Sequence, residues 1–383
     1  MFVLKNISMM NFSASVFSQF QKRYWWLGIL WLVWITPAQA SVVMRVAIER
    51  GVSQVKVGSS TRAVVRDYIT GQILGQIAAM NAFSAQKSAT KVVIDRIQAN
   101  AVWIEPTAGG YIFIGDRWYR GKTLILRMGE GLTAINYVDL EQYLYSVVGA
   151  EVYDSWPQDA LKAQAVAART YALYVRTYEN NGMYDLGNTD YWQAYRGLET
   201  EAPSTRAAVN ATAKQVLTYK GQIIESQFQD CSGGHTENVE DVWGNYLPYL
   251  RGVEGYDEGV SECQWIKTFT PQELSARISG VGNITSLVPT LTTYGSIKSM
   301  LIVGDLGTRQ LSGETLRLTL NLKSARFQIK PDASGSLRFE GSGWGHGVGM
   351  SQWGAYYLAS HGVNYQRILG HYYQKTVLAE MQD

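Results

Sequence analysis

A glycine-rich segment near the C-terminus constrains the fold of this chain more than any other feature. Residues 343–355 contain five glycines in thirteen residues, and among them stand Trp344, His346, Ser351, Gln352 and Trp353. Glycine loses more backbone entropy on folding than other residues, so a dense run is tolerated where the chain needs a positive φ or a close approach. The segment therefore predicts a functional site. The alternative is a structural turn in which His346 makes one hydrogen bond.

The N-terminus has the pattern of a secretory signal. Residues 1–40 hold Lys5, Lys22 and Arg23 and no acid, followed by an apolar run over 24–35 and by Ala38-Gln39-Ala40. This predicts cleavage before Ser41 and a secreted protein of the periplasm or cell wall. An uncleaved anchor is the alternative, but the run is shorter than the about 20 residues that span a bilayer. We expect no membrane span in the mature form.

Charge excludes one class of partner. The chain has 34 Lys and Arg against 32 Asp and Glu, and three of the basic residues lie in the predicted signal, which leaves a mature net charge of −1. A nucleic-acid footprint needs clustered Lys and Arg, so we expect no nucleic-acid partner. The 343 residues that remain exceed one typical core, which predicts one large domain with an insertion, or two lobes.

The two cysteines, Cys231 and Cys263, allow three interpretations. Export to an oxidising compartment favours a disulfide. Cys231 and His235 also have a spacing that suits zinc, but a site needs three or four ligands. A catalytic thiol requires a free cysteine, which the second cysteine argues against.

The chain changes character along its length, which predicts an α+β fold. Short β-branched and aromatic runs separated by Gly and Asp predict strands at 42–48, 55–57, 63–65, 92–94, 101–104, 111–114 and 123–126. The tract 78–90 has no clear period and predicts an exposed loop. We therefore expect a β-rich N-terminal lobe, followed by a mixed α+β core with a buried alanine-rich helix.

That helix follows a predicted capping box formed by Ser155 and Gln158, with Pro157 in the first turn. An apolar stripe with many alanines predicts a buried central helix that ends near 180–182. Further elements are expected downstream: a helix over 204–214, strands at 216–219 and 223–228, short strands with one helix at 271–278, and helices over 351–359 and 364–373.

Glu151 is the first candidate for chemistry. It lies among Val147, Val148, Ala150 and Val152. An apolar setting raises a carboxyl pKa and keeps a fraction protonated near neutrality, as a general acid requires. The alternative is a carboxylate that serves a helix dipole or pairs with Arg169. Tryptophans beside hydrogen-bonding groups in the glycine-rich segment suit a sugar groove, since sugar rings have apolar faces ringed by hydroxyls.

Ordered blocks of the sequence resemble the SpoIID/LytB family of bacterial cell-wall proteins. The resemblance covers about residues 120–376, and its blocks are 143–152, 156–172, 232–238, 241–243, 248–253 and 343–355. It implies a SpoIID/LytB-like domain over 121–376, which follows the predicted signal peptide over 1–40 and the predicted β-rich lobe over 41–120. It also implies a lytic transglycosylase that cuts the bond between N-acetylmuramic acid and N-acetylglucosamine in peptidoglycan and leaves a 1,6-anhydro ring.

The resemblance places the acid/base at Glu151. We expect the glycan groove to be lined by Arg169, Ser232, His235, Trp243, Trp344, His346, Ser351 and Gln352. The expected partner is the peptidoglycan glycan strand, and a cell-wall amidase is a second partner if the chain acts as LytB-type enhancers do, without chemistry. No cofactor is expected. Some relatives carry zinc through Cys and His, so Cys231 and His235 leave a zinc hydrolase as a third hypothesis.

Overall fold

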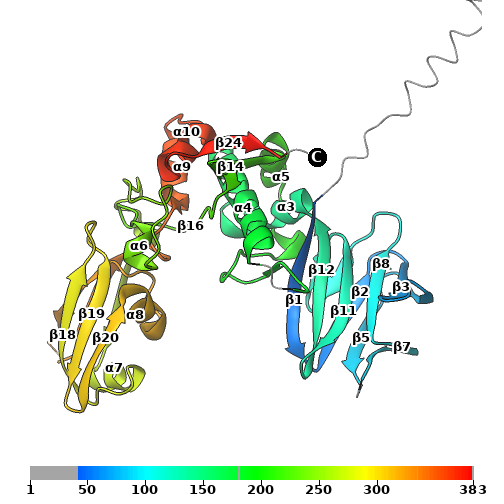
Figure 1. Ribbon diagram of the computed structural model, residues 1–383, viewed down its shortest axis with the longest axis horizontal. Coiled ribbons are helices and arrows are strands. Elements are labelled where there is room, and N and C mark those ends of the chain that lie inside the picture. Colours follow the sequence, from blue (N-terminus) through cyan, green and yellow to red (C-terminus); the bar gives the residue numbers. More distant parts are fainter. Residues whose placement is uncertain (1–41, 89, 180–181, 334, 382–383) are drawn as a thin grey trace, which may run out of the picture. The chain divides into compact units, whose positions relative to one another are not determined.

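The computed structural model describes residues 42–88, 90–179, 182–333 and 335–381 (Figure 1). The predicted signal over residues 1–40 lies outside them. Helices and strands are both abundant, so the α+β class is confirmed. None of the helices within the described residues has the length and apolar character needed to cross a membrane.

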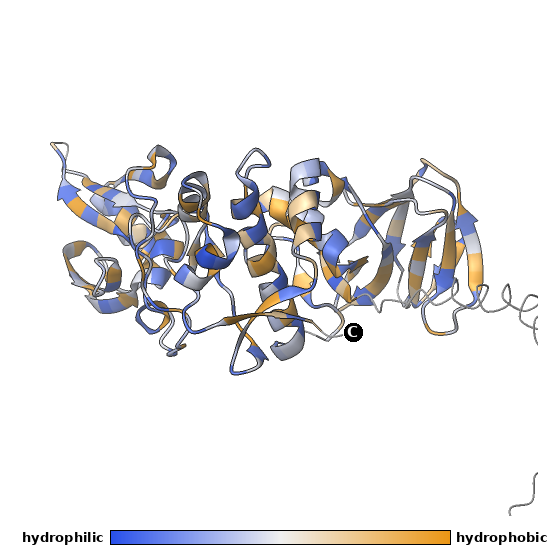
Figure 2. Cartoon of the chain, turned by 90° about the horizontal axis from the view of Figure 1, so that it is seen from above, coloured by the Kyte–Doolittle hydropathy of each residue, from blue (hydrophilic) through white to orange (hydrophobic). Residues whose placement is uncertain are grey.

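The N-terminal lobe consists of two sheets whose inner faces form a shared apolar core. The first has the order β13 (Leu186–Gly187), β1 (Val43–Val52), β12 (Gly131–Asp139), β11 (Lys122–Met128), β8 (Ala101–Pro106), β3 (Ala63–Asp67), β4 (Ile73–Ile77). The second has the order β10 (Arg117–Tyr119), β9 (Ile112–Ile114), β2 (Gln54–Ser59), β5 (Ala82–Lys87), β6 (Val92–Ile94), β7 (Ile97–Ala99). Hydrophobic and hydrophilic residues alternate along many of these strands (Figure 2), as expected when one face is buried. The strands predicted in this lobe are present.

Two details of this lobe differ from the predictions. The tract predicted as an exposed loop contains β5, which pairs with β2 and β6. Its outward positions include Ala82 as well as polar residues, and its inward positions are the half-buried Phe83 and the buried Ala85, so the alternation is weak in the sequence. The main sheet also continues past the predicted boundary at residue 120, because β12 pairs with β1 as far as Asp139.

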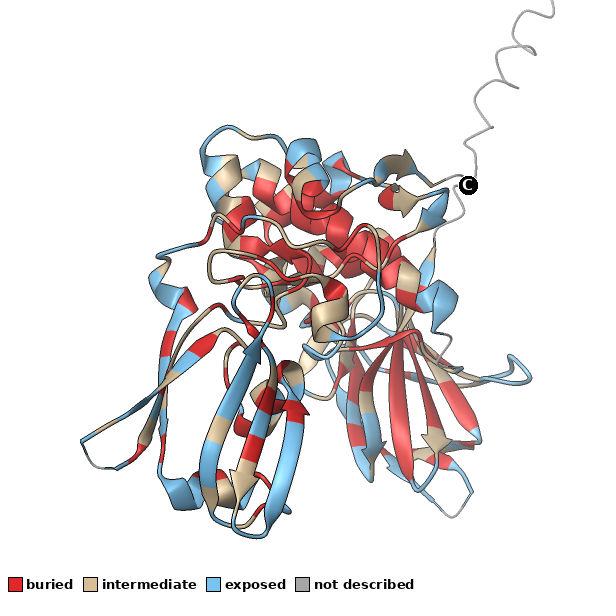
Figure 3. Cartoon of the chain, turned by 60° about the vertical axis from the view of Figure 1, so that its left-hand side comes forward, coloured by how far each residue is buried: buried red, intermediate tan, exposed pale blue. Residues whose placement is uncertain are grey.

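The alanine-rich helix α4 (Gln158–Tyr178) is buried as predicted, and it is red along most of its length in Figure 3. It packs against α3 (Leu140–Glu151), α5 (Pro203–Ala211), α9 (Gln352–Ser360) and α10 (Tyr365–Tyr372). Alanines allow these close approaches. The predicted capping box is wrong: Pro157 is the N-cap and makes no side-chain cap bond. Ser155 lies instead in a turn, where the Trp156 N–H donates to the Tyr153 carbonyl and the Trp156 ring is buried.

Short elements connect the helices. The hairpin β14 (Gln215–Tyr219) and β15 (Gln222–Ile223) turns at Lys220 and Gly221, both with positive φ, and β24 (Val377–Glu380) pairs with β14. The predicted strand over 223–228 divides, because the chain leaves the hairpin so that β16 (Phe228–Gln229) can pair in parallel with β23 (Met350–Ser351). Three further short helices lie between α4 and residue 264: η1 (Gly197–Thr200), α6 (Val239–Val242) and η2 (Ser261–Cys263).

Residues 264–342 form an inserted lobe with its own core. It contains β17 (Gln264–Phe269), α7 (Pro271–Arg277), β18 (Ile284–Leu291), β19 (Ile297–Gly304), β20 (Gly307–Ser312), α8 (Gly313–Leu320), β21 (Phe327–Pro331) and β22 (Leu337–Ser342). The helix α8 was not predicted; Ser312 caps its start and Asn321 ends it with a φ of 53°. The first and last residues of the lobe lie side by side, because Gln264 pairs with Ser342.

Candidate active site

Glu151 is held by segments that are distant in sequence. It is the last residue of α3, and its Oε1 accepts a hydrogen bond from the Ala194 N–H at 2.7 Å. Its Oε2 accepts one from Nε2 of Gln352, the first residue of α9, at 3.3 Å. Three segments therefore converge on one carboxyl: the end of α3, the loop before η1 and the end of the glycine-rich segment.

The surroundings of Glu151 leave it poised between its two protonation states. Burial raises its pKa to about 7 and the charge of Asp190 adds to this, whereas the bonds from Ala194 and Gln352 and the charge of Arg196 act in the opposite direction. The residue as a whole is still partly exposed. A carboxyl with such a pKa gives and takes a proton near neutral pH, provided that a substrate reaches it.

An aromatic cluster lies next to Glu151 in the chain and in space. Tyr153 and Trp156 follow Glu151, and Trp353 and Tyr356 follow Gln352. The Trp156 ring lies 5.2 Å from Trp353 and 5.1 Å from Tyr356, and the Tyr153 ring lies 6.3 Å from Trp353. Tyr153 is 61% exposed. Our sequence reasoning did not place Tyr153 or Trp156 in the groove, although their position just after Glu151 was a usable signal.

The glycine-rich segment needs its glycines for the reason the sequence predicts. Gly343, Gly345, Gly347 and Gly349 all have positive φ, and a Cβ on Gly349 would collide with the Gln227 carbonyl. The segment thus approaches the chain around β16 closely enough for β23 to pair with it. That pairing fixes where α9 begins and so where Gln352 meets Glu151.

His346 supports this segment and does not offer a free ring nitrogen to a ligand. Its Nε2 donates to the Phe228 carbonyl and its Nδ1 accepts from the Val348 N–H, both at 3.1 Å. Burial lowers its pKa to about 4, which keeps the ring neutral. The expectation that His346 binds the glycan is corrected, because the backbone occupies both nitrogens. Its ring packs against Trp243, with ring centroids 4.9 Å apart.

Ser232 and Ser351 are also corrected as groove residues, because both are buried on Asp257. The Asp257 carboxylate accepts bonds from the Ser232 N–H and hydroxyl, from the Gly234 N–H and from the Ser351 hydroxyl, at 2.5 to 2.9 Å. The Ser351 hydroxyl in turn accepts from the Gly354 N–H and caps α9. Asp257 has no exposed surface. It joins the Ser-Gly-Gly loop to the start of α9, and we found no motif that predicts it.

Arg169 is the third correction. Its side chain has no exposure, and two guanidinium nitrogens bind Glu141 at 2.8 and 2.6 Å. Further bonds go to the carbonyls of Val209 and Gln215. Arg169 therefore joins α4 to α3, to α5 and to the start of β14. Because Glu141 is its partner, the alternative in which Arg169 pairs with Glu151 is wrong as well.

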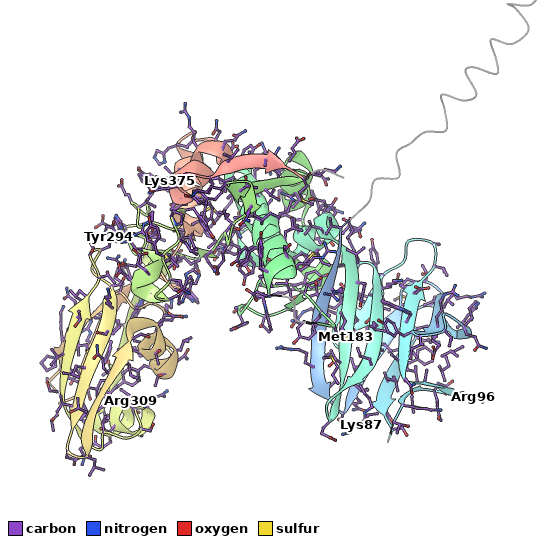
Figure 4. All side chains as sticks on the ribbon, viewed as in Figure 1. Lys87, Arg96, Met183, Tyr294, Arg309 and Lys375 are labelled. Atoms are coloured by element: carbon purple, nitrogen blue, oxygen red, sulfur yellow. A yellow bond between two sulfur atoms is a disulfide. The ribbon has the colours of Figure 1, made fainter. Side chains whose placement is uncertain are left out.

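The remaining groove candidates differ in exposure. Trp243 is 38% exposed and Trp344 is 45% exposed, so both present ring surface to a ligand. His235 stacks on Tyr294, with centroids 3.9 Å apart, and its Nδ1 lies 2.7 Å from the Thr236 carbonyl. Tyr294 lies at the end of the inserted lobe nearest α6 (Figure 4), so His235 helps to attach that lobe.

The cysteine and histidine donors do not fit a zinc site. Cys231 and Cys263 form a disulfide that joins residues 32 apart, so neither sulfur is a thiolate ligand. The Nδ1 of His235 is occupied by a carbonyl contact. Within the described parts of the chain, no group of three or more His, Cys, Asp and Glu side chains is placed to hold a metal ion.

The chain matches one family model and is similar to several known proteins. The family model described as "Stage II sporulation protein" matches residues 128–219. The chain is 32% identical over 272 residues to Stage II sporulation protein D of Bacillus subtilis, a match that spans 64% of this chain and 76% of that protein. It is 34% identical over 274 residues to an uncharacterized protein of Brachyspira hyodysenteriae, spanning 70% and 73%. The Amidase enhancer of Bacillus subtilis is 31% identical over 291 residues, which span 61% of this chain and 40% of that protein.

Proposed function

This chain belongs to the stage II sporulation protein D (SpoIID/LytB) family, and on that premise we propose that it is an exported peptidoglycan lytic transglycosylase. Its substrate is the glycan strand, and the cleaved bond joins N-acetylmuramic acid to N-acetylglucosamine. Glu151 is the general acid and base. Trp243, Trp344 and the rings of Tyr153, Trp353 and Tyr356, which pack on or near the buried Trp156, provide ring faces for the sugars, and Gln352 orients the acid.

The observation that carries this proposal is the setting of the Glu151 carboxyl. A catalyst that first gives a proton and then takes one works best when its pKa lies near the working pH. Burial supplies that pKa, at about 7, and the residue as a whole keeps some exposed surface. The Ala194 N–H occupies Oε1 at 2.7 Å. The bond from Gln352 to Oε2 is longer, at 3.3 Å, so Oε2 is the oxygen that more readily carries the acidic proton.

One carboxyl is sufficient for the complete reaction. Protonated Glu151 gives its proton to the glycosidic oxygen as the bond from that oxygen to C1 of the muramic residue breaks, which releases the N-acetylglucosamine hydroxyl. The C1 centre becomes electron-poor, and the C6 hydroxyl oxygen of the same muramic residue bonds to it. Glu151, now a carboxylate, takes the C6 hydroxyl proton and returns to its starting state. The product is the 1,6-anhydro ring, and no water is consumed.

The second candidate is a non-catalytic enhancer of a cell-wall amidase. The match to the Amidase enhancer of Bacillus subtilis favours it, although this chain spans only 40% of that protein. An enhancer would use the same groove to hold glycan while a partner cuts the stem peptide. It does not require the raised pKa of Glu151.

Mass spectrometry of glycan strands separates these functions. Strands with and without stem peptides are incubated with the mature protein or with its Glu151→Gln variant. We expect new 1,6-anhydro-muramic ends from the wild type and a loss of about 10²- to 10⁴-fold in the variant, since general acid–base catalysis contributes that much. Reducing ends without the anhydro ring would show hydrolysis. If the wild type is folded and binds glycan but makes no new ends, the enhancer is favoured. In that case the Glu151→Gln variant should stimulate an amidase as the wild type does.

A further inference from the structure

A cavity of about 400 Å³ opens on the N-terminal lobe, to which the proposed reaction gives no role. Its walls come from β8, from the chain just before β9, from the turn between β10 and β11 and from the first turn of α3. The polar side chains that line it are those of Glu105, Tyr111, Arg120, Lys122 and Gln142. The cavity therefore lies where the N-terminal lobe joins α3.

The cavity is separate from the Glu151 site, although α3 contributes to both. Gln142 lies in the first turn of α3, and Glu151 is the last residue of the same helix. With about 3.6 residues per turn, the two side chains project from opposite sides of the helix, and a rise of about 1.5 Å per residue separates them by about 14 Å along its axis. Ala194 and Gln352, which bond to Glu151, do not line the cavity. A ligand in the cavity would therefore occupy a second site.

Arg120 is held in one orientation at this cavity. Its Nε and Nη2 donate to the two carboxylate oxygens of Glu201 at 2.7 and 2.8 Å, and the Glu201 side chain is only 7% exposed. The ring centres of Tyr111 and Tyr145 lie 5.5 and 5.7 Å from the guanidinium carbon. Because two of its nitrogens are fixed by one buried partner, the position of the third, Nη1, is fixed as well.

Lys122 is a second cation with a fixed position. Its ammonium donates to Oε1 of Glu105 at 2.8 Å, and Nε of Arg66 donates to Oε2 of the same carboxylate at 2.9 Å. The Lys122 side chain is still 41% exposed. The three cations Arg66, Arg120 and Lys122 thus face two carboxylates, Glu105 and Glu201. One positive charge remains in excess.

Several hydrogen-bond donors of the cavity remain available. Within the part of the chain that the structure describes, the Arg120 Nη1, the Tyr111 hydroxyl and the Gln142 side-chain amide have no hydrogen-bond partner. The Lys122 ammonium uses one of its N–H bonds for Glu105. Donors around an excess positive charge suit a carboxylate, which accepts up to about four hydrogen bonds and bonds strongly to a guanidinium.

We propose that this cavity is a second, non-catalytic site that binds carboxylates of peptidoglycan. The bound carboxylate accepts hydrogen bonds from Nη1 of Arg120 and from the Lys122 ammonium, and the Gln142 amide bonds to a polar group beside it. Peptidoglycan offers carboxylates from two sources: the lactyl group of a muramic residue without a stem peptide, and the stem peptide itself. The inference rests on the proposed function for the identity of the polymer. It gives the N-terminal lobe the role of holding the wall while Glu151 acts elsewhere on it.

The test measures binding of small ligands and does not depend on cleavage. Ligand-observed NMR titrations give Kd values for N-acetylmuramic acid, for free stem peptide and for N-acetylglucosamine, which has no carboxylate. The proteins are the mature wild type, Lys122→Gln, Gln142→Leu and the matched control Lys56→Gln, at an exposed position of β2. We expect Lys122→Gln to weaken binding of at least one carboxylate ligand about three- to tenfold, as for one hydrogen bond, and Gln142→Leu to weaken it less. The control should bind as the wild type does.

The two carboxylate ligands distinguish the sources, because the ligand that loses affinity in Lys122→Gln is the one that the cavity binds. If both variants bind both carboxylate ligands as tightly as the wild type, the inference is overturned. It is also overturned if Lys122→Gln weakens binding of N-acetylglucosamine equally, since the cavity would then recognise a sugar. If Lys122→Gln does not fold, Gln142→Leu, which removes no bonded partner, decides the outcome.

Failure of this site and failure of the transglycosylase give different results. A wild-type protein that binds a carboxylate ligand through Lys122 but forms no 1,6-anhydro ends keeps the cavity site and loses the proposed reaction. A protein that forms these ends while Lys122→Gln and Gln142→Leu bind normally keeps the reaction and loses the cavity site.

Discussion

Two consecutive residues bond to two different carboxyls: Ser351 to that of Asp257 and Gln352 to that of Glu151. The surroundings of these two carboxyls are opposite. Asp257 has no exposed surface and accepts bonds from two N–H groups and two hydroxyls. Glu151 accepts from one N–H and one distant amide and stays partly exposed. The difference is one of hydrogen-bond donors. A carboxylate surrounded by donors is fixed in place, whereas one that is desolvated with few donors is ready to exchange a proton.

The largest effect expected from this comparison is on stability at Asp257. The change Asp257→Ala leaves the N–H groups of Ser232 and Gly234 and the Ser351 hydroxyl buried without an acceptor. Each unsatisfied group costs about 1 to 3 kcal/mol, so we expect a loss of at least about 3 kcal/mol in the free energy of unfolding. Urea denaturation measures it. Asp257→Asn, which keeps one acceptor oxygen, should lose less. A loss below about 1 kcal/mol for the alanine variant would mean that Asp257 does not anchor the loop.

A smaller effect with a distinct pH course is expected at Glu151. Its folded pKa of about 7 exceeds the ordinary value of 4.5, so the folded state binds the proton more tightly than the unfolded state. The stability that this provides is present below pH 4.5 and is lost as the pH rises through 7. Glu151→Gln has no such loss. It should match wild type near pH 4 and be more stable at pH 8, by about 3 kcal/mol at most.

Unfolding curves for wild type and Glu151→Gln at pH 4, 6 and 8 check this course. Glu130→Gln, at an exposed turn of the N-terminal lobe, is the matched control and should show no widening gap. A gap for Glu151→Gln that stays constant across these pH values would contradict the raised pKa. Such a result would remove the main support for acid/base catalysis without affecting the comparison of Asp257.

The sequence could reveal Glu151 but not Asp257, and the reason is physical. Glu151 stands among apolar neighbours in its own helix, so its desolvation is a local property. Asp257 stands in a loop, and its importance comes from Ser232 and Ser351, which only the fold brings to it. The predicted roles of those serines and of Arg169 failed for the same reason: their partners are 25, 94 and 28 residues away.

Periodicity and glycine chemistry were more informative. The buried helix α4 and the β strands of the N-terminal lobe follow from local patterns, and positive φ follows from the glycines of 343–349. The strand β5 was missed because its one buried residue is an alanine, and α8 because its cap lies within a run of strands. Local signals therefore define the elements and Glu151, whereas the contacts between elements decide which of the other side chains face a ligand.

The smallest expected effect is at Gln352, which bonds to Glu151 and follows Ser351, the residue that bonds to Asp257. Its bond to Oε2 of Glu151 is long, at 3.3 Å, and acts to lower the pKa of that carboxyl. Gln352→Leu removes the donor, so the pKa should rise and the alkaline limb of the profile of kcat/KM against pH should move to higher pH. The rate at the optimum should change by less than about tenfold, as expected for one hydrogen bond. Gln72→Leu, at an exposed position between β3 and β4, is the control. A limb that moves to lower pH would show that Gln352 instead stabilises the protonated acid, with its amide turned so that the oxygen accepts the Glu151 proton.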